Sequence, residues 1–144
     1  MKRHIVLLAL CACFLLNGCQ EKNTNVDLDI TEDFYISYIN ELYTNPNSYL
    51  GKTVHLEGLC ATYYDEEEKV TYYFVYRNGP GCCNNDAMAG LEFTFTAGKA
   101  PQANDWISVT GTLKGYMYQN NLTLTVSTTS VEFPETRGKE TVTQ

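Results

Sequence analysis

Four side chains that can bind a metal or form a sulfur bond stand out in this sequence of 144 residues. They are Cys60, Cys82, Cys83 and Asp86, and the last three fall in one stretch rich in Gly, Pro and Asn. Thiolates favour soft metals, and structural zinc sites use four ligands. The sequence therefore predicts a candidate site for Zn²⁺ or another thiophilic metal, held by the three cysteines with Asp86 or His55 as the fourth ligand.

The same thiols allow other interpretations. Neighbouring Cα atoms lie about 3.8 Å apart, whereas disulfides need about 4.4–6.8 Å, so a Cys82–Cys83 bond would be strained. A disulfide from Cys60 to one of the pair is easier and leaves one thiol free. Cys60 can also be a small buried hydrophobic residue. Redox catalysis is disfavoured because the usual Cys-x-x-Cys spacing is absent from the sequence.

Arg77 and His55 are the other polar side chains that bear on this site. Arg77 is the basic residue nearest the cysteine pair in the sequence. It could lower a thiol pKa or pair with Asp86, and we expect an ion pair on a strand surface. We expect His55 to be a surface residue rather than a ligand, because a lone histidine is weak support for a site. A thiol-dependent enzyme would need His55 as its base, and we expect no enzyme.

The N-terminus has the parts of a bacterial export signal. Two basic residues precede an uncharged apolar run over residues 5–16, which is shorter than the roughly 20 residues of a membrane-spanning helix. The following Leu16-Asn17-Gly18-Cys19 resembles the lipobox of bacterial lipoproteins. We therefore expect residues 1–18 to be a signal peptide, and Cys19 to carry acyl chains that anchor the protein to a membrane of the cell envelope, outside the cytoplasm.

Charge and composition divide the rest of the chain. Removal of residues 1–18 takes away two basic residues and no acid, so the net charge of −7 becomes more negative. An acidic, exported domain argues against nucleic acid as a partner. Residues 19–30 and 134–144 are polar, and we expect a tether and a disordered tail. Residues 31–133 are long enough for one domain with one core.

Apolar periodicity within that domain predicts one helix followed by five strands. Apolar residues recur at helical spacing from Phe34 to Tyr43, and Asn45-Pro46 ends the helix. Strands are expected over residues 53–64, 70–77, 91–96, 106–118 and 122–127. The first and fourth are long and contain Gly58 and Gly111, where a strand can bend. The prediction is a mainly β fold, a five-stranded OB-like barrel with one N-terminal helix, and a β-sandwich is the alternative.

Four groups of residues carry a family resemblance. They are Tyr49-Leu50-Gly51-Lys52-Thr53-Val54, Glu57-Gly58, Arg77 with Cys82-Cys83 and Asp86-Ala87, and Asp105-Trp106-Ile107-Ser108-Val109-Thr110-Gly111. Together they resemble the C-terminal domain of YcgQ-like bacterial envelope proteins over most of residues 46–133. The resemblance implies an OB-like envelope domain that often accompanies a predicted permease, without a settled activity. The family's multi-helix membrane region has no counterpart in this sequence, where the lipid would replace it.

These features together predict a lipid-anchored extracytoplasmic binding module. The face of the first three expected strands carries many tyrosines, which suits recognition, and the thiol cluster suits a metal. Expected partners are the membrane, through the lipid anchor, and an envelope protein or permease. The alternative is a purely structural envelope lipoprotein with a structural disulfide.

Replacement of Cys19 by alanine should release the protein from the membrane, because acyl chains can then no longer be attached. The measurement is incorporation of labelled palmitate into the full chain, together with its partition between aqueous and detergent phases. The C19A chain should lose the label and enter the aqueous phase, whereas a Cys13→Ala control should keep both properties. A C19A chain that still takes up label would contradict lipidation at this position.

Overall fold

The computed structural model describes residues 25–80 and 87–143. Its elements are, in chain order, β1 Leu28–Ile30, α1 Tyr35–Thr44, β2 Thr53–Asp65, β3 Val70–Gly79, β4 Ala87–Thr94, β5 Trp106–Tyr118 and β6 Asn121–Glu132. Short 3₁₀ turns at Glu32–Phe34 and Pro46–Ser48 flank α1. No helix within the described ranges is long and apolar enough to cross a membrane.

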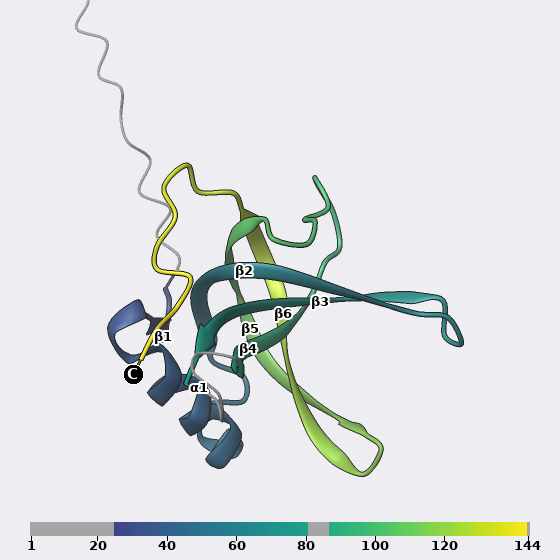
Figure 1. The fold of residues 1–144 in the computed structure, drawn as a ribbon. Coiled ribbons are helices and arrows are strands. Elements are labelled where there is room, and N and C mark those ends of the chain that lie inside the picture. Colours follow the sequence, from purple (N-terminus) through teal and green to yellow (C-terminus); the bar gives the residue numbers. More distant parts are fainter. Residues whose placement is uncertain (1–24, 81–86, 144) are drawn as a thin grey trace, which may run out of the picture.

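Strands β2 to β6 form a closed barrel. The β2–β3, β3–β4 and β5–β6 pairs are antiparallel, β4 and β6 are parallel, and an antiparallel β2–β5 pairing closes the ring. The short β1 is an additional strand that runs parallel to β2 at its side. The predicted mainly β fold, a five-stranded OB-like barrel with one helix before it, is confirmed (Figure 1).

Two glycines allow the long strands β2 and β5 to curve around the barrel. Gly58 lies where β2 passes from its pairing with β5 to its pairing with β3, and a Cβ there would collide with the Tyr76 carbonyl. Gly111 lies at a register shift between β5 and β6, and a Cβ there would collide with the Ser127 carbonyl. Only glycine permits these close approaches of two backbones.

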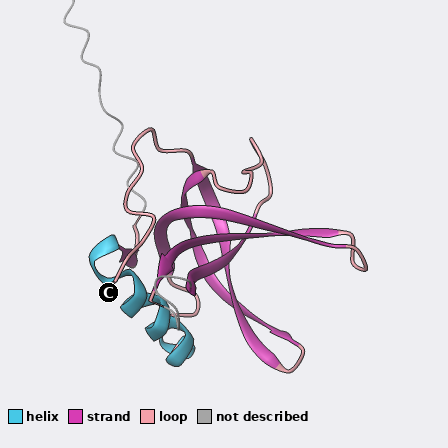
Figure 2. Ribbon diagram, viewed as in Figure 1, coloured by secondary structure: helices cyan, strands magenta, loops and turns pink. Residues whose placement is uncertain are grey.

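The barrel interior is apolar, and α1 lies at one end of it (Figure 2). Alternate residues of the strands point inward, and the fully buried ones include Val54, Leu56, Val75, Leu91, Ile107, Val109, Leu113, Leu124 and Val126. The helix adds Tyr35, Ile39 and Leu42 from one face to the same core. This is the helical periodicity expected from the sequence.

Two long hairpins extend from the barrel, one formed by β2 and β3 and the other by β5 and β6 (Figure 1). Their outer parts expose large side chains, among them Tyr63 and Tyr64 on the first and Met117 and Tyr118 on the second. Strand β4 pairs with β3 on one side and with β6 on the other, so it lies between the two hairpins. The hairpins therefore flank one outer face of β4.

The strand boundaries differ most from the prediction in β4 and β6. β4 begins at Ala87 rather than at residue 91, and β6 ends at Glu132 rather than at residue 127. The first residues of β4 lack the alternation that identifies a strand, but they pair with β3 up to Gly79. Pairing with a neighbour, which no local pattern reveals, extends both strands.

Both polar ends of the domain pack against the barrel, where the composition predicted a tether and a disordered tail. Residues 28–30 form β1, and Ile30 is buried. Near the C-terminus, Val142 is 4% exposed, the Asn78 N–H donates to the Glu140 carbonyl, and the Val142 N–H donates to the Asn78 carbonyl. A segment that is polar on average can still bury one apolar side chain, as Val142 shows. The backbone of β3 at Asn78 has a free edge, and the C-terminal segment supplies its hydrogen-bond partner.

Arg77 is buried, which corrects the predicted strand-surface ion pair. Arg77 is 3% exposed, and its Nε donates to the Glu57 carbonyl at 2.8 Å. Nη1 donates to the Lys139 carbonyl at 3.0 Å and to Glu32 Oε2 at 3.2 Å. The guanidinium also lies over the rings of Tyr35 and Trp106, with Cζ at 5.1 and 4.9 Å from their centroids. A buried charge needs such partners because it has lost its water.

Glu32 is the acidic partner in this cluster, which we call the Arg77 cluster (Arg77, Glu32, Glu57, Lys139). The Lys139 backbone N–H donates to Glu32 Oε2 at 3.0 Å, and Lys139 Nζ lies 3.3 Å from Oε1. These bonds from Lys139, with a smaller contribution from Arg77, lower the pKa of Glu32. The cluster joins the turn before α1 to β2, β3 and the C-terminal segment.

Replacement of Arg77 by methionine should lower the free energy of unfolding by about 3–5 kcal/mol, because the partners of a buried charge are left unpaired. The measurement is urea-induced unfolding of the full chain. Arg137→Met is the matched control, since the exposed Arg137–Glu140 pair is worth at most about 1 kcal/mol. Equal stability of the R77M and R137M chains would show that the Arg77 cluster does not hold this end of the barrel.

Candidate functional site

The predicted thiol site is only partly within the described residues. Cys82, Cys83 and Asp86 lie outside them, so the choice between a metal and a disulfide stays a prediction. Cys60 is a free cysteine within the described chain, 1% exposed in the core. Burial, with the charge of Asp105, raises the pKa of its thiol to about 11, which disfavours the thiolate that binds metals. Among the described residues, no three His, Cys, Asp or Glu side chains could share a metal ion.

His55 bridges three strands on the outer side of the barrel. Its Nδ1 lies 2.6 Å from Asp29 Oδ1 on β1, and its Nε2 lies 2.9 Å from Ser108 Oγ on β5. Because a carboxylate only accepts hydrogen bonds, Nδ1 carries a proton. His55 points away from the core that holds Cys60, so the structure does not bring this base to that thiol.

The order Asp29–His55–Ser108 is that of an orienting carboxylate, a base and a hydroxyl nucleophile. Acyl transfer also needs N–H donors aimed at the developing oxyanion. Ser108 lies in β5 opposite Glu57 of β2 and Glu132 of β6, so its backbone groups point along the sheet toward those strands. We therefore interpret the three side chains as a cross-strand lock that fastens β1 to the barrel.

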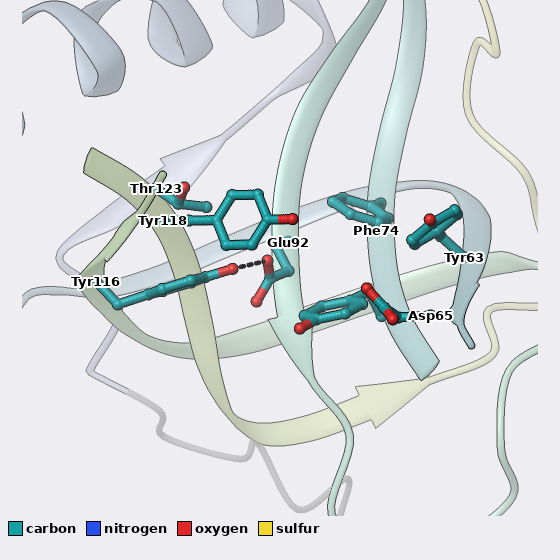
Figure 3. A pocket seen from close by; sticks show the side chains of 8 residues that line it. Tyr63, Asp65, Phe74, Glu92, Tyr116, Tyr118 and Thr123 are labelled. Carbon is teal, nitrogen blue, oxygen red and sulfur yellow. Dashed lines mark hydrogen bonds between the residues drawn. The ribbon is translucent and has the colours of Figure 1, made fainter. Parts of the chain in front are cut away.

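A second set of side chains encloses a cavity of about 200 Å³ beside β4, which we call the hairpin pocket. Its lining residues are Tyr63 and Asp65 of β2, Tyr72 and Phe74 of β3, Glu92 of β4, Tyr116 and Tyr118 of β5, and Thr123 of β6. Figure 3 shows Glu92 between the Tyr116 and Tyr118 rings on one side and the Phe74 and Tyr63 rings on the other. The pocket is thus built by both hairpins and floored by β4.

Strand alternation explains why these side chains meet. In β4, Glu92 lies between Leu91 and Phe93, which are both buried in the core, so Glu92 points to the opposite face. In β3, Phe74 alternates with the core residue Val75 and lies opposite Glu92 in register. The lining residues therefore come from the outer face of the sheet, and the two hairpins cover that face where they flank β4.

Two tyrosine hydroxyls in the hairpin pocket donate to carboxylates. Tyr116 Oη donates to Glu92 Oε2 at 2.6 Å (Figure 3), and Tyr72 Oη donates to Glu68 Oε2 at 2.6 Å. Burial, reinforced by the bond to Glu92, raises the pKa of Tyr116. The bond to Glu68 raises the pKa of Tyr72 to about 12. Both phenols stay protonated at neutral pH, so neither tyrosine adds a negative charge to the pocket.

Sequence reasoning missed this pocket. The alternation in residues 91–96 puts Glu92 on the solvated face of its strand, and the tyrosine-rich recognition face is expected on the first three barrel strands, without Tyr116 and Tyr118 of the fourth. Glu92 is 8% exposed because side chains from the two hairpins cover it, and that contact depends on the barrel closure. The signal in the sequence is a carboxylate in a strand of an aromatic-rich sheet, and it becomes informative once the order of the strands is known.

Replacement of His55 by phenylalanine should loosen β1 selectively, because the links to Asp29 and Ser108 are both lost. The measurement is amide hydrogen exchange of the full chain, which should become faster at residues 28–30 and stay unchanged in α1. Thr62→Phe, a change at an exposed position of β2 outside its pairing with β1, is the control and should leave β1 protected. Unchanged exchange at residues 28–30 in H55F would contradict the cross-strand lock.

Comparison with known proteins adds one family. The sequence model of the DUF1980 C-terminal domain matches residues 17–136, which include every segment that resembles the YcgQ-like proteins. No curated protein and no solved structure matches the chain. The family match covers most of the chain and agrees with the barrel described above. The chain therefore belongs to the DUF1980 C-terminal domain family.

Proposed function

We propose that this protein is a lipid-anchored binding module of the bacterial cell envelope, and that the hairpin pocket is its ligand site. One observation carries the proposal. A concave site of about 200 Å³ lies between two hairpins and combines several aromatic rings with a buried carboxylate. Ligand sites are usually concave and mostly apolar, with a few placed polar groups that orient the ligand.

The aromatic rings of the pocket are not needed for the core. Tyr63 and Tyr118 are 60% and 47% exposed, whereas the core is complete without them. Exposed aromatic side chains grouped around one cavity favour an interaction site over a purely structural role. This grouping supports the binding module against the alternative of a structural envelope lipoprotein.

The position of the pocket in the barrel supports the same proposal by analogy. OB barrels bind their ligands on the face of the second and third barrel strands and at the first and last hairpin loops. In this chain those elements are β3, β4 and the two hairpins that build the pocket. Fold analogy alone does not give a ligand, and the lining includes carboxylates and no basic residue, which argues against nucleic acid.

The anchor and the partner complete the proposal. Acylation at Cys19 would hold the barrel close to a membrane outside the cytoplasm, where the pocket meets envelope molecules. A membrane protein such as a permease is the partner that the family resemblance implies. In this proposal the thiol segment between β3 and β4 is separate from the ligand site. A metal bound there would stabilise the fold or contribute a second contact with a partner.

The test is binding of small probes to the full chain in a neutral detergent, followed by amide chemical shifts in nuclear magnetic resonance spectra. The probes are n-butylammonium, butyrate and N-acetylglucosamine, which represent a cation, an anion and a neutral sugar. At least one should shift the amide signals of Phe74, Glu92 and Tyr116 in a saturable way. These residues lie on three different strands, so coincident shifts report on the pocket itself.

A matched pair of variants makes this test specific. Tyr118→Ala removes an exposed ring that lines the pocket, and Tyr64→Ala removes an exposed ring that does not. The affinity of the bound probe should fall in Y118A and stay unchanged in Y64A. Absence of pocket shifts with all three probes, or equal effects of the two variants, would overturn the proposed site.

A further inference from the structure

The carboxylate of Glu92 keeps one oxygen available to a ligand. The residue is 8% exposed, and within the described chain its one hydrogen bond comes from Tyr116 to Oε2. The described ion pairs give Glu92 no lysine or arginine partner. Oε1 is not among the fully buried atoms that lack a partner in the described chain, so it is accessible from the cavity, where a carboxylate oxygen has capacity for a further donor.

The surroundings of Glu92 favour a cation as that donor. The Phe74, Tyr63 and Tyr118 rings line the same cavity, and aromatic faces attract positive charge through their quadrupole. Asp65 adds a second carboxylate at the hairpin side of the pocket. An anion would meet two carboxylates without a basic residue, and a neutral group would leave the buried charge of Glu92 unpaired.

The cavity also limits the size of the group. Its volume of about 200 Å³ is below the roughly 300–1,000 Å³ of sites that enclose whole drug-sized ligands. It therefore accommodates one head group, with the rest of the molecule outside the mouth. A primary ammonium fits this description, because it has three N–H donors and a narrow alkyl stem that can pass between rings.

We infer that the hairpin pocket binds the primary ammonium group of a larger envelope molecule, with Glu92 accepting its N–H and the aromatic rings packing around its alkyl stem. This inference rests on the proposed function, because it names the ligand class of the same site. Glu92 is the specificity-determining residue, and Tyr116 positions its carboxylate through the hydrogen bond to Oε2.

The experiment compares the affinities of n-butylammonium, butyrate and N-acetylglucosamine for the full chain in a neutral detergent. We expect n-butylammonium to bind and butyrate to show no saturable binding. Glu92→Gln should weaken n-butylammonium binding about tenfold or more, the loss expected when a charged hydrogen-bond partner is removed. Glutamine keeps an oxygen that can accept the Tyr116 hydroxyl, so the fold should be retained.

Glu66→Gln is the control, because it makes the same charge change at an exposed position of the β2–β3 hairpin outside the pocket lining. Its affinity for n-butylammonium should match that of the wild type. Equal affinities of E92Q and wild type would overturn the inference. Pocket binding of N-acetylglucosamine or butyrate without n-butylammonium would overturn the inference and support the proposed function, whereas no binding of any probe would overturn both.

Discussion

The buried guanidinium of Arg77 joins parts of the chain that are far apart in the sequence. It reaches the turn before α1 through Glu32, β2 through the Glu57 carbonyl, and the C-terminal segment through the Lys139 carbonyl. A charge without water must find its partners within the protein, so these three segments have to be in place together. The Arg77 cluster therefore makes the helix end of the barrel a single unit, to which the polar ends of the domain also belong.

The hairpin pocket lies away from that unit along the same strands. Arg77 is near the end of β3, where Gly79 pairs with Ala87, whereas Phe74 pairs with Glu92 nearer the β2–β3 hairpin. One end of the β3–β4 pair is thus fixed by the buried charge of Arg77 and by backbone contacts with the C-terminal segment. The other end lies between the two hairpins, which carry exposed aromatic rings. A rigid frame with recognition side chains at its outer end is the arrangement expected of a binding module.

The cysteine pair falls between β3 and β4 in the sequence. The Gly79–Ala87 pair that flanks this segment lies five register positions from the Phe74–Glu92 pair. At about 3.4 Å per residue, that is roughly 17 Å along the strands. Cys60, buried in the core, belongs to the packing of the barrel.

Elements whose signal is local are predictable from the amino-acid sequence alone. Apolar periodicity identified the helix and all five barrel strands, and Gly58 and Gly111 marked the bends that allow closure into an OB-like barrel. Which side chains those strands bring together depends on how the barrel closes. Arg77 and Glu92 look like surface residues because each is charged, although Arg77 shares the core-facing side of β3 with Val75, whereas Glu92 lies on the face of β4 opposite the core. Their burial comes from contacts with segments distant in the chain. The C-terminal segment covers Arg77, and the two hairpins surround Glu92. Periodicity reports which face of a strand a residue occupies, but only the path of the whole chain determines what covers that face.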